Sequence, residues 1–231
     1  MKRIGLIGGT SYESTITYYD VINKEGIKAM GTGDNPEIIL FSANQEKCYG
    51  NLAAGRIDEA AEYMTMAAKT LEQAGAEMIL FCANTTHLVA PEVQAHIGVP
   101  IVHIVDAVAD AMTEMGIDKA ALLGTPLTMK LPFYRDILEN KYGIETIVPD
   151  EEYYDRMMKI IQGELDCGII KEDSREFFLQ VIDSCKAAGA KGAILGCTEI
   201  PLLVKQEHCD IPVFDTATIH AKYAVKLARE D

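Results

Sequence analysis

The chain has 231 residues, of which 48% are hydrophobic and 24% are charged, and its formal net charge is −14. This length can bury a core in one globular unit or in two small domains. So acidic a protein repels phosphate backbones and anionic lipid headgroups, which disfavours nucleic acid and membranes as partners. The apolar runs are far shorter than the roughly 20 residues of a transmembrane helix. Mixed charge without low-complexity stretches also excludes a disordered chain.

Hydrophobic runs alternate with helical patterns from end to end. The predicted strands cover residues 2–7, 36–42, 77–81, 100–104, 120–123, 145–148, 192–195 and 211–214. The predicted helices cover residues 13–30, 56–73, 106–115, 127–142, 152–164, 174–188 and 216–229. Apolar strands separated by helices are typical of a parallel sheet covered on both faces, so the sequence predicts an α/β fold.

The second half of the chain repeats landmarks of the first in the same order. Ala74-Gly75-Ala76 recurs as Ala188-Gly189-Ala190, Gly9-Thr10 as Gly124-Thr125, and Val99-Pro100-Ile101 as Ile211-Pro212-Val213. This order favours a duplicated domain over a chance similarity of α/β units. Two such domains are expected to place their strand ends around one cleft, since parallel sheets bind ligands beyond the carboxyl ends of their strands.

Four strand ends are rich in small residues, hydroxyls and thiols: residues 8–11, 82–86, 124–125 and 196–199. Such groups, with backbone N–H at helix starts, suit a carboxylate ligand. At one strand end, Cys197 is expected to have a lowered pKa and to act as a nucleophile or proton-transfer base. Glu199 either orients or deprotonates this thiol, or caps the next helix.

Other residue patterns bear on cofactors, metals and cellular compartment. Gly8-Gly9 lacks the G-x-G-x-x-G fingerprint, so no nucleotide cofactor is expected. No CxxC and no zinc-ligand spacing occurs, which predicts no metal site. Because the N-terminus enters a strand pattern without a signal peptide, we expect a reduced, cytoplasmic protein. His87 either touches substrate or caps a helix.

Cys82 is a second candidate thiol. The internal repeat aligns Cys197 with Ala83 and not with Cys82. Because neighbouring strand residues face opposite sides of a sheet, this register turns Cys82 away from the cleft.

Four segments resemble the aspartate/glutamate racemase family over the whole chain. Residues 1–15 and 214–221 are similar to its opening and its C-terminal signature, Cys82-Ala83-Asn84-Thr85-Thr86-His87 to its first catalytic motif, and Gly196-Cys197-Thr198-Glu199-Ile200-Pro201 to its second. The resemblance implies two similar parallel-sheet α/β lobes related by pseudo-two-fold symmetry, with the active site in the cleft between them. Crossovers near the proline strands imply that lobe one comprises residues 1–100 plus 209–231, and lobe two residues 101–208.

The resemblance also implies a PLP-independent amino-acid racemase, without metal or nucleotide and commonly a homodimer. Two cysteines of such racemases flank the substrate's α-carbon, and one removes the α-proton while the other delivers a proton to the opposite face. Ala83 replaces the first cysteine here, so Cys197 is expected to be the principal acid/base. The expected substrate-binding residues are Thr10, Ser11, Gln45, Asn84, Thr85, Thr86, Thr125 and Thr198; Glu199 and Cys82 complete the catalytic candidates.

Two alternatives stay open. A single acid at Cys197 also suits a decarboxylase or isomerase of a small carboxylic acid, because one proton donor can protonate one face of an enolate-like intermediate. A weakly active amino-acid-binding protein is the third possibility. The substrate side chain is open as well, because Lys47 could hold a carboxylate that Asp166 would oppose.

Overall fold

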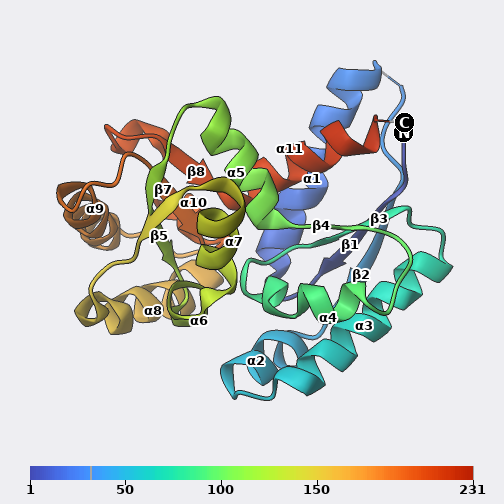
Figure 1. Ribbon diagram of the computed structural model, residues 1–231, viewed down its shortest axis with the longest axis horizontal. Helices are drawn as coiled ribbons and strands as arrows, with labels where there is room; N and C mark the ends of the chain where they lie inside the picture. The colour runs from blue at the N-terminus through green and yellow to red at the C-terminus, as the bar shows by residue number, and fades with distance from the viewer. Residues whose placement is uncertain (32, 231) are drawn as a thin grey trace. The chain divides into compact units, whose positions relative to one another are not determined.

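The computed structural model describes residues 1–31 and 33–230 and forms two compact units. The first unit comprises Met1–Ile104 and the segment from Ala217 to the C-terminus, and the second comprises Val105–Thr216 (Figure 1). Each unit contains a four-stranded, all-parallel sheet with helices. The prediction of an α/β fold with two similar lobes is therefore confirmed.

The sheet of the first unit has the strand order β2-β1-β3-β4. Its strands are β1 (Ile4–Gly8), β2 (Ile38–Ser42), β3 (Met78–Phe81) and β4 (Ile101–Val102). Both central strands, β1 and β3, are buried along their full length. Their apolar runs are continuous because helices cover both faces of the sheet.

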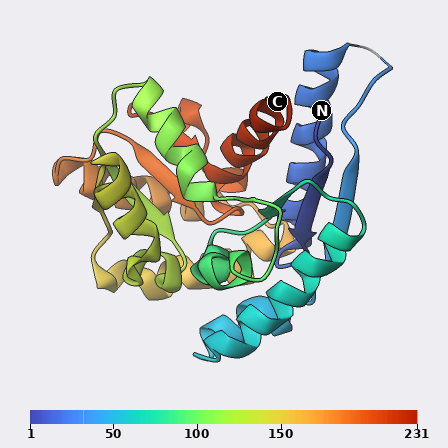
Figure 2. The same cartoon turned by 45° about the vertical axis from the view of Figure 1, so that its right-hand side comes forward.

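Two layers of helices flank this sheet (Figures 1 and 2). On one face lie α1 (Tyr12–Met30) and α11 (Thr216–Ala228), whose apolar side chains share a core with alternate residues of β1 and β3. On the other face lies α3 (Ile57–Gln73), against which α4 (Ala90–Gln94) packs. The short elements are a π-helix η1 (Glu46–Gly50), α2 (Asn51–Ala53) and a 3₁₀ helix η2 (Thr85–Val89).

The second unit repeats the arrangement of the first, with the strand order β6-β5-β7-β8. Its strands are β5 (Lys119–Gly124), β6 (Glu145–Ile147), β7 (Ala193–Gly196) and β8 (Val213–Asp215). Its helices are α5 (Ile104–Glu114), α6 (Pro126–Lys130), α7 (Pro132–Tyr142), η3 (Glu151–Tyr153), α8 (Tyr154–Gly163), η4 (Leu165–Cys167), α9 (Glu172–Ala187), α10 (Ile200–Leu203) and η5 (Gln206–His208). The α8 and α9 side chains form one core with alternate residues of β5 and β7.

The helix after the last strand of each unit belongs to the other unit. Thus α5 follows β4 but is part of the second unit, and α11 follows β8 but is part of the first. In the second unit, Asp106 of α5 accepts hydrogen bonds from Lys141 Nζ (2.9 Å) and Tyr142 Oη (2.8 Å) of α7. In the first unit, His220 of α11 accepts a 2.7 Å hydrogen bond from the Tyr18 hydroxyl of α1. Because β4 pairs with β3 and β8 with β7, the chain crosses after these strands, whereas the sequence-based boundaries at 100/101 and 208/209 precede them.

One predicted helix is two helices in the structure. Residues 127–142 were expected to form a single helix, but α6 and α7 are separated at Leu131, whose φ of −77° and ψ of 143° are extended. Pro132 is the cause, because proline disfavours the helical conformation of the residue before it and then fits the first position of the next helix.

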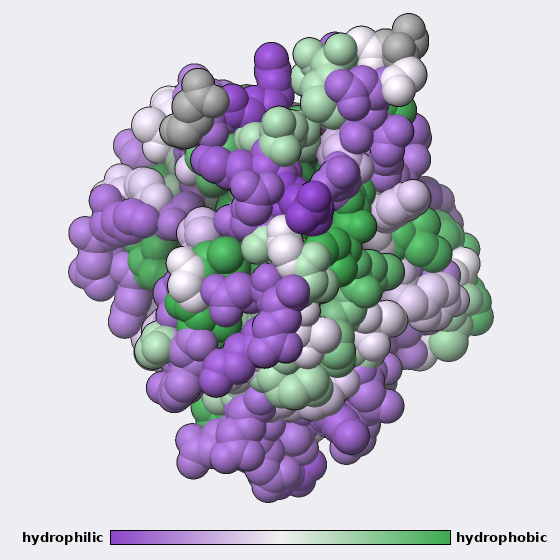
Figure 3. Space-filling view, turned by 90° about the vertical axis from the view of Figure 1, so that its right-hand side faces the viewer, coloured by the Kyte–Doolittle hydropathy of each residue, from purple (hydrophilic) through white to green (hydrophobic). Residues whose placement is uncertain are grey.

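The face of the molecule drawn in Figure 3 is mostly polar. Figure 3 shows one face, on which hydrophilic side chains surround smaller areas of hydrophobic ones. Within residues 1–31 and 33–230, no helix combines the length and the apolar character needed to cross a bilayer.

Candidate functional site

The loops after β1 and β3 lie at the same edge of the first sheet, because the parallel register pairs Ile7 with Phe81. Gly9 follows β1 with a φ of +84°, and its N–H donates a 2.9 Å hydrogen bond to Thr15 Oγ1. A Cβ at this position would lie 2.2 Å from the carbonyl oxygen of Ala43. Glycine therefore lets the loops after β1 and β2 pack against each other.

Two predicted substrate-binding hydroxyls cap helices. Ser11 Oγ accepts a 3.3 Å hydrogen bond from the Ser14 N–H at the start of α1. Thr125 Oγ1 accepts one of the same length from the Thr128 N–H at the start of α6. Both residues are the N-cap of the helix that follows the first strand of their unit, although the sequence repeat pairs Thr125 with Thr10 and not with Ser11.

The other predicted binding residues of the first unit fall into two groups. Thr10, Asn84, Thr85 and Thr86 are buried at the carboxyl edge of the sheet, and Thr10 Oγ1 lies 3.3 Å from Cys48 Sγ. Gln45 precedes the π-helix η1 and is exposed. Nothing in the sequence pattern pointed to Cys48, because the π-helix that presents it was not predicted.

Cys82 lies in the core that the sheet shares with α1 and α11. Complete burial raises the pKa of its thiol well above the ordinary value. Cys197 belongs instead to the core under α8 and α9 of the second unit. Because α9 precedes β7 as α3 precedes β3, the two cysteines lie on non-equivalent faces of their sheets.

Cys197 forms a buried pair with Glu199. Cys197 is 7% exposed and Glu199 is 4% exposed, and Cys197 Sγ donates a 3.0 Å hydrogen bond to Glu199 Oε2. Thr198 Oγ1 lies 3.1 Å and 3.0 Å from the two carboxylate oxygens, to which it donates. This motif therefore gathers a thiol, a hydroxyl and a carboxylate within three consecutive residues.

The expected lowering of the Cys197 pKa is wrong. Burial, then the charge of Glu199 and its hydrogen bond to the thiol, raise the pKa of Cys197 well above the ordinary value. The helix that follows, α10, has four residues, and Glu199 is its N-cap residue, but the Glu199 side chain makes no capping hydrogen bond. The resting pair is consequently a thiol that keeps its proton and donates it in a hydrogen bond to the Glu199 side chain, an arrangement that suits proton transfer rather than a standing thiolate.

Asp166 is a further acidic group near this pair. It lies in η4, which packs against α10. Burial and the charge of Glu199 raise the pKa of Asp166 to about 6, and its own charge adds to the raised pKa of Cys197. The sequence offered no signal for this proximity, because 33 positions separate Asp166 from Glu199 (199 minus 166).

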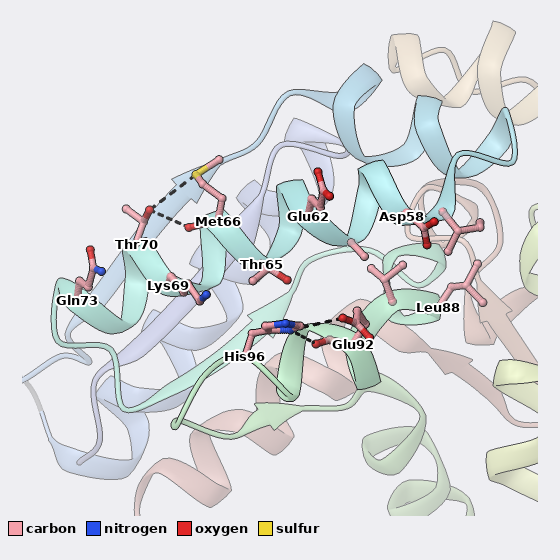
Figure 4. Close-up of a pocket in the computed structure, with 13 residues that line it drawn as sticks. Asp58, Glu62, Thr65, Met66, Lys69, Thr70, Gln73, Leu88, Glu92 and His96 are labelled. Atoms are coloured by element: carbon pink, nitrogen blue, oxygen red, sulfur yellow. Dashed lines mark hydrogen bonds and ion pairs between the residues drawn. The ribbon is translucent and has the colours of Figure 1, made fainter.

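A groove of about 900 Å³ lies elsewhere in the first unit, between α3 and α4 (Figure 4). Its lining includes Met66, Glu92 and His96, and His96 Nδ1 donates to the carbonyl oxygen of Glu92 at 2.8 Å. None of the predicted site residues is among those that line it. In the described part of the chain, no group of three or more His, Cys, Asp or Glu side chains is arranged to hold a metal ion.

The spacing of these motifs along the whole chain matches a known family. Residues 7–224 match the sequence profile of the family described as Asp/Glu/Hydantoin racemase. The chain belongs to this family. It is therefore an enzyme of the racemase class, and racemases are isomerases.

Solved structures of the racemase family share the fold along its full length. A putative Asp/Glu racemase from Yersinia pestis is 45% identical with a TM-score of 0.92, over 99% of both chains. An aspartate racemase homologue from Pyrococcus horikoshii OT3 is 40% identical with a TM-score of 0.86, over 100% of both chains.

Sequence relatives within the racemase family are more distant. The broad specificity amino-acid racemase RacX of Bacillus subtilis (strain 168) is 25% identical over 96% of both chains. The glutamate racemase of Shewanella woodyi is 26% identical, and the match spans 67% of this chain and 56% of that protein. The chain thus spans little more than half of this longer relative.

Proposed function

We propose that the protein is a PLP-independent amino-acid racemase that transfers the α-proton of its substrate, with Cys197 as the principal acid/base. The buried hydrogen bond from Cys197 Sγ to Glu199 Oε2 carries this proposal. A protonated thiol is a proton donor, and the carboxylate beside it can accept the thiol proton when a base is needed.

The proposed reaction begins with the proton moving from Cys197 Sγ to Glu199. The thiolate then takes the α-proton, and the electrons of the Cα–H bond move into the substrate carboxylate to form an enolate-like intermediate. A proton delivered to the opposite face gives the other enantiomer, and Glu199 releases its proton to solvent, from which the donor at that face regains one. In the reverse direction, the Cys197 thiol itself protonates the intermediate. Because Ala83 stands in place of a second cysteine, we assign the proton transfer at the opposite face to water or to another residue.

Binding of the substrate carboxylate is proposed for Thr10, Asn84, Thr85 and Thr198. The first three are buried at the carboxyl edge of the first sheet, and Thr198 lies beside Glu199. Hydroxyl and amide groups of this kind suit a carboxylate.

The remaining candidates receive supporting roles in this proposal. The Ser11, Thr86 and Thr125 hydroxyls each bond to the backbone, so we assign them the shaping of the loops. The buried Cys82 is assigned to the core, and Gln45, which is exposed, is kept as a contact for the substrate side chain.

A decarboxylase or isomerase of a small carboxylic acid is the second candidate function. Ala83 supports it, because a single thiol is enough to protonate one face of an enolate-like intermediate. Incubation with a panel of acidic, neutral and basic amino acids and of small malonate-type acids in heavy water separates the functions. A racemase gives both enantiomers with deuterium at Cα, detected by chiral chromatography and NMR. Release of CO₂ instead, or a thermal shift without exchange, would contradict the racemase proposal.

We also propose that the protein works as a homodimer in the cytoplasm. The family resemblance supports the dimer, and all six cysteines are free thiols, in keeping with a reducing compartment. Light scattering of the purified protein should give twice the 25.3 kDa mass of the chain. A monomer mass at working concentration would contradict the dimer.

A further inference from the structure

His87 lies at the end of the first motif with both ring nitrogens in contact with backbone. The side chain is 1% exposed. Its Nδ1 lies 2.9 Å from the carbonyl oxygen of Ala83, and its Nε2 lies 3.3 Å from the amide nitrogen of Ile104. A carbonyl only accepts and an amide only donates, so Nδ1 carries the proton and Nε2 accepts.

The surroundings keep this imidazole neutral. The rings of His103 and His220 lie 4.6 Å and 5.6 Å from that of His87. Burial, and then the charge that these two histidines would carry, hold the pKa of His87 well below its ordinary value. With both nitrogens committed to backbone groups, the ring is not available to bind or protonate a substrate.

The two hydrogen bonds connect segments with different roles. Ala83 follows β3, and its carbonyl oxygen also accepts a 2.9 Å hydrogen bond from Thr86 Oγ1. Because a peptide group is planar, fixing this carbonyl fixes the Ala83–Asn84 peptide and the direction in which Asn84 and Thr85 leave the strand. Ile104 is the first residue of α5, where backbone N–H groups lack partners within the helix.

We propose that His87 is a positioning residue whose bond to Ala83 holds the carboxylate-binding loop in place, while its bond to Ile104 serves stability alone. The inference rests on the proposed function, because it assigns the residues after Ala83 to substrate binding. This role also explains why the motif contains a histidine whose two ring nitrogens both contact backbone groups.

Two substitutions separate the two bonds. Asparagine can donate to the carbonyl four residues earlier, as Asn23 Nδ2 does to Tyr19 O at 2.7 Å and Asn51 Nδ2 to Lys47 O at 3.1 Å. Glutamine is longer and can accept from a backbone amide, as Gln94 Oε1 does from the Ile101 N–H at 2.7 Å. His87→Asn therefore keeps the Ala83 bond, and His87→Gln keeps the Ile104 bond.

The kinetic signatures of the two variants should differ. His87→Gln should raise KM roughly tenfold with kcat little changed, because the lost bond serves ground-state binding of the carboxylate. His87→Asn should keep KM within about threefold of wild type and lower the melting temperature more than His87→Gln does. A purely structural histidine would change melting temperature in both variants and leave the KM of the folded enzyme unchanged.

His220→Asn is the matched control. His220 is buried in the same histidine cluster, its Nε2 donates to Val102 O at 2.8 Å, and its Nδ1 lies 2.7 Å from the Tyr18 hydroxyl. This variant should have a lower melting temperature than wild type and the same KM. If the His87 variants do not fold, Thr86→Val and Thr86→Ser test the same carbonyl, and only the valine variant should raise KM.

Three results would overturn the inference. One is a wild-type KM for His87→Gln or, if that variant does not fold, for Thr86→Val. The second is an equal rise in KM for His87→Asn and His87→Gln. The third is a wild-type protein that exchanges the α-proton of no amino acid, which overturns the proposed function and this inference together, whereas the first two leave the proposed function intact.

Discussion

In the Cys197–Glu199 pair the shared proton is on the sulfur, which donates it to the carboxylate. The position of this proton determines which proton transfers the pair can make. Burial and then the charge of Glu199 raise the pKa of the thiol, and in the proposed reaction a thiolate forms when the carboxylate takes the proton. In the proposed reaction, the carboxylate that disfavours the resting thiolate is also the base that creates it. Removing the charge should separate these two effects.

Glu199→Gln should make Cys197 more reactive and the enzyme slower. The pKa of the thiol falls when the neighbouring charge is lost, so alkylation of Cys197 by iodoacetamide at pH 8 should accelerate. Racemisation should slow by roughly 10²–10⁴-fold because the proton acceptor is gone. Peptide mass spectrometry follows the alkylation, and a variant whose turnover rises with its alkylation rate would refute the role of Glu199.

Asp166 should make stability depend on pH. Its folded pKa of about 6 lies above the usual 3.8, so the folded state binds more protons than the unfolded state between these values. Stability therefore falls as pH rises from about 3.8 to about 6. Asp166→Asn should have a higher melting temperature than wild type at pH 8, and the difference should shrink towards pH 4. A difference independent of pH would show that the carboxyl is not perturbed.

At the scale of elements, the loop after β1 depends on a glycine. Gly9→Ala should destabilise the protein by about 2 kcal/mol or more, because the positive φ and the contact with the Ala43 carbonyl both oppose a Cβ. Gly55→Ala is the control, since Gly55 has a similar φ of +76° with no atom within 4 Å of the added Cβ. Urea unfolding gives both values, and equal losses would show that the close contact costs nothing.

Long elements could be predicted from the sequence, whereas short ones could not. The strands and helices with clear periodicity lie within a few residues of their predicted places, as α3 and β3 do. The π-helix η1, the 3₁₀ helix η4 and the four-residue α10 carry no periodic signal, because so few residues cannot show one. Cys48 lies in η1, Asp166 lies in η4, and α10 begins directly after Glu199. The surroundings of the candidate site could therefore not be predicted from the sequence.

At the scale of the whole molecule, the duplication was visible in the sequence because both halves retain the same strand order and turn residues. The strand ends that carry Thr10, Asn84, Thr125 and Cys197 could be located for the same reason, since the topology of a parallel sheet places them at its carboxyl edge. Contacts that arise from tertiary packing could not be located from the sequence. The bonds of His87 are the clearest case, because Ala83 and Ile104 meet only in the folded unit.

The central claim is that one thiol, Cys197, carries the proton transfer. The most direct test measures the rate at which deuterium enters the α-position of an amino-acid substrate in heavy water, for wild type, Cys197→Ser and Cys82→Ser. A serine hydroxyl is a far poorer proton-transfer group than a thiol at neutral pH, so Cys197→Ser should slow exchange by roughly 10²–10⁴-fold. Folded Cys82→Ser should exchange at a rate close to wild type, because Cys82 lies in the core under α1 and α11. Equal losses in the two variants, or exchange that survives Cys197→Ser, would contradict the account.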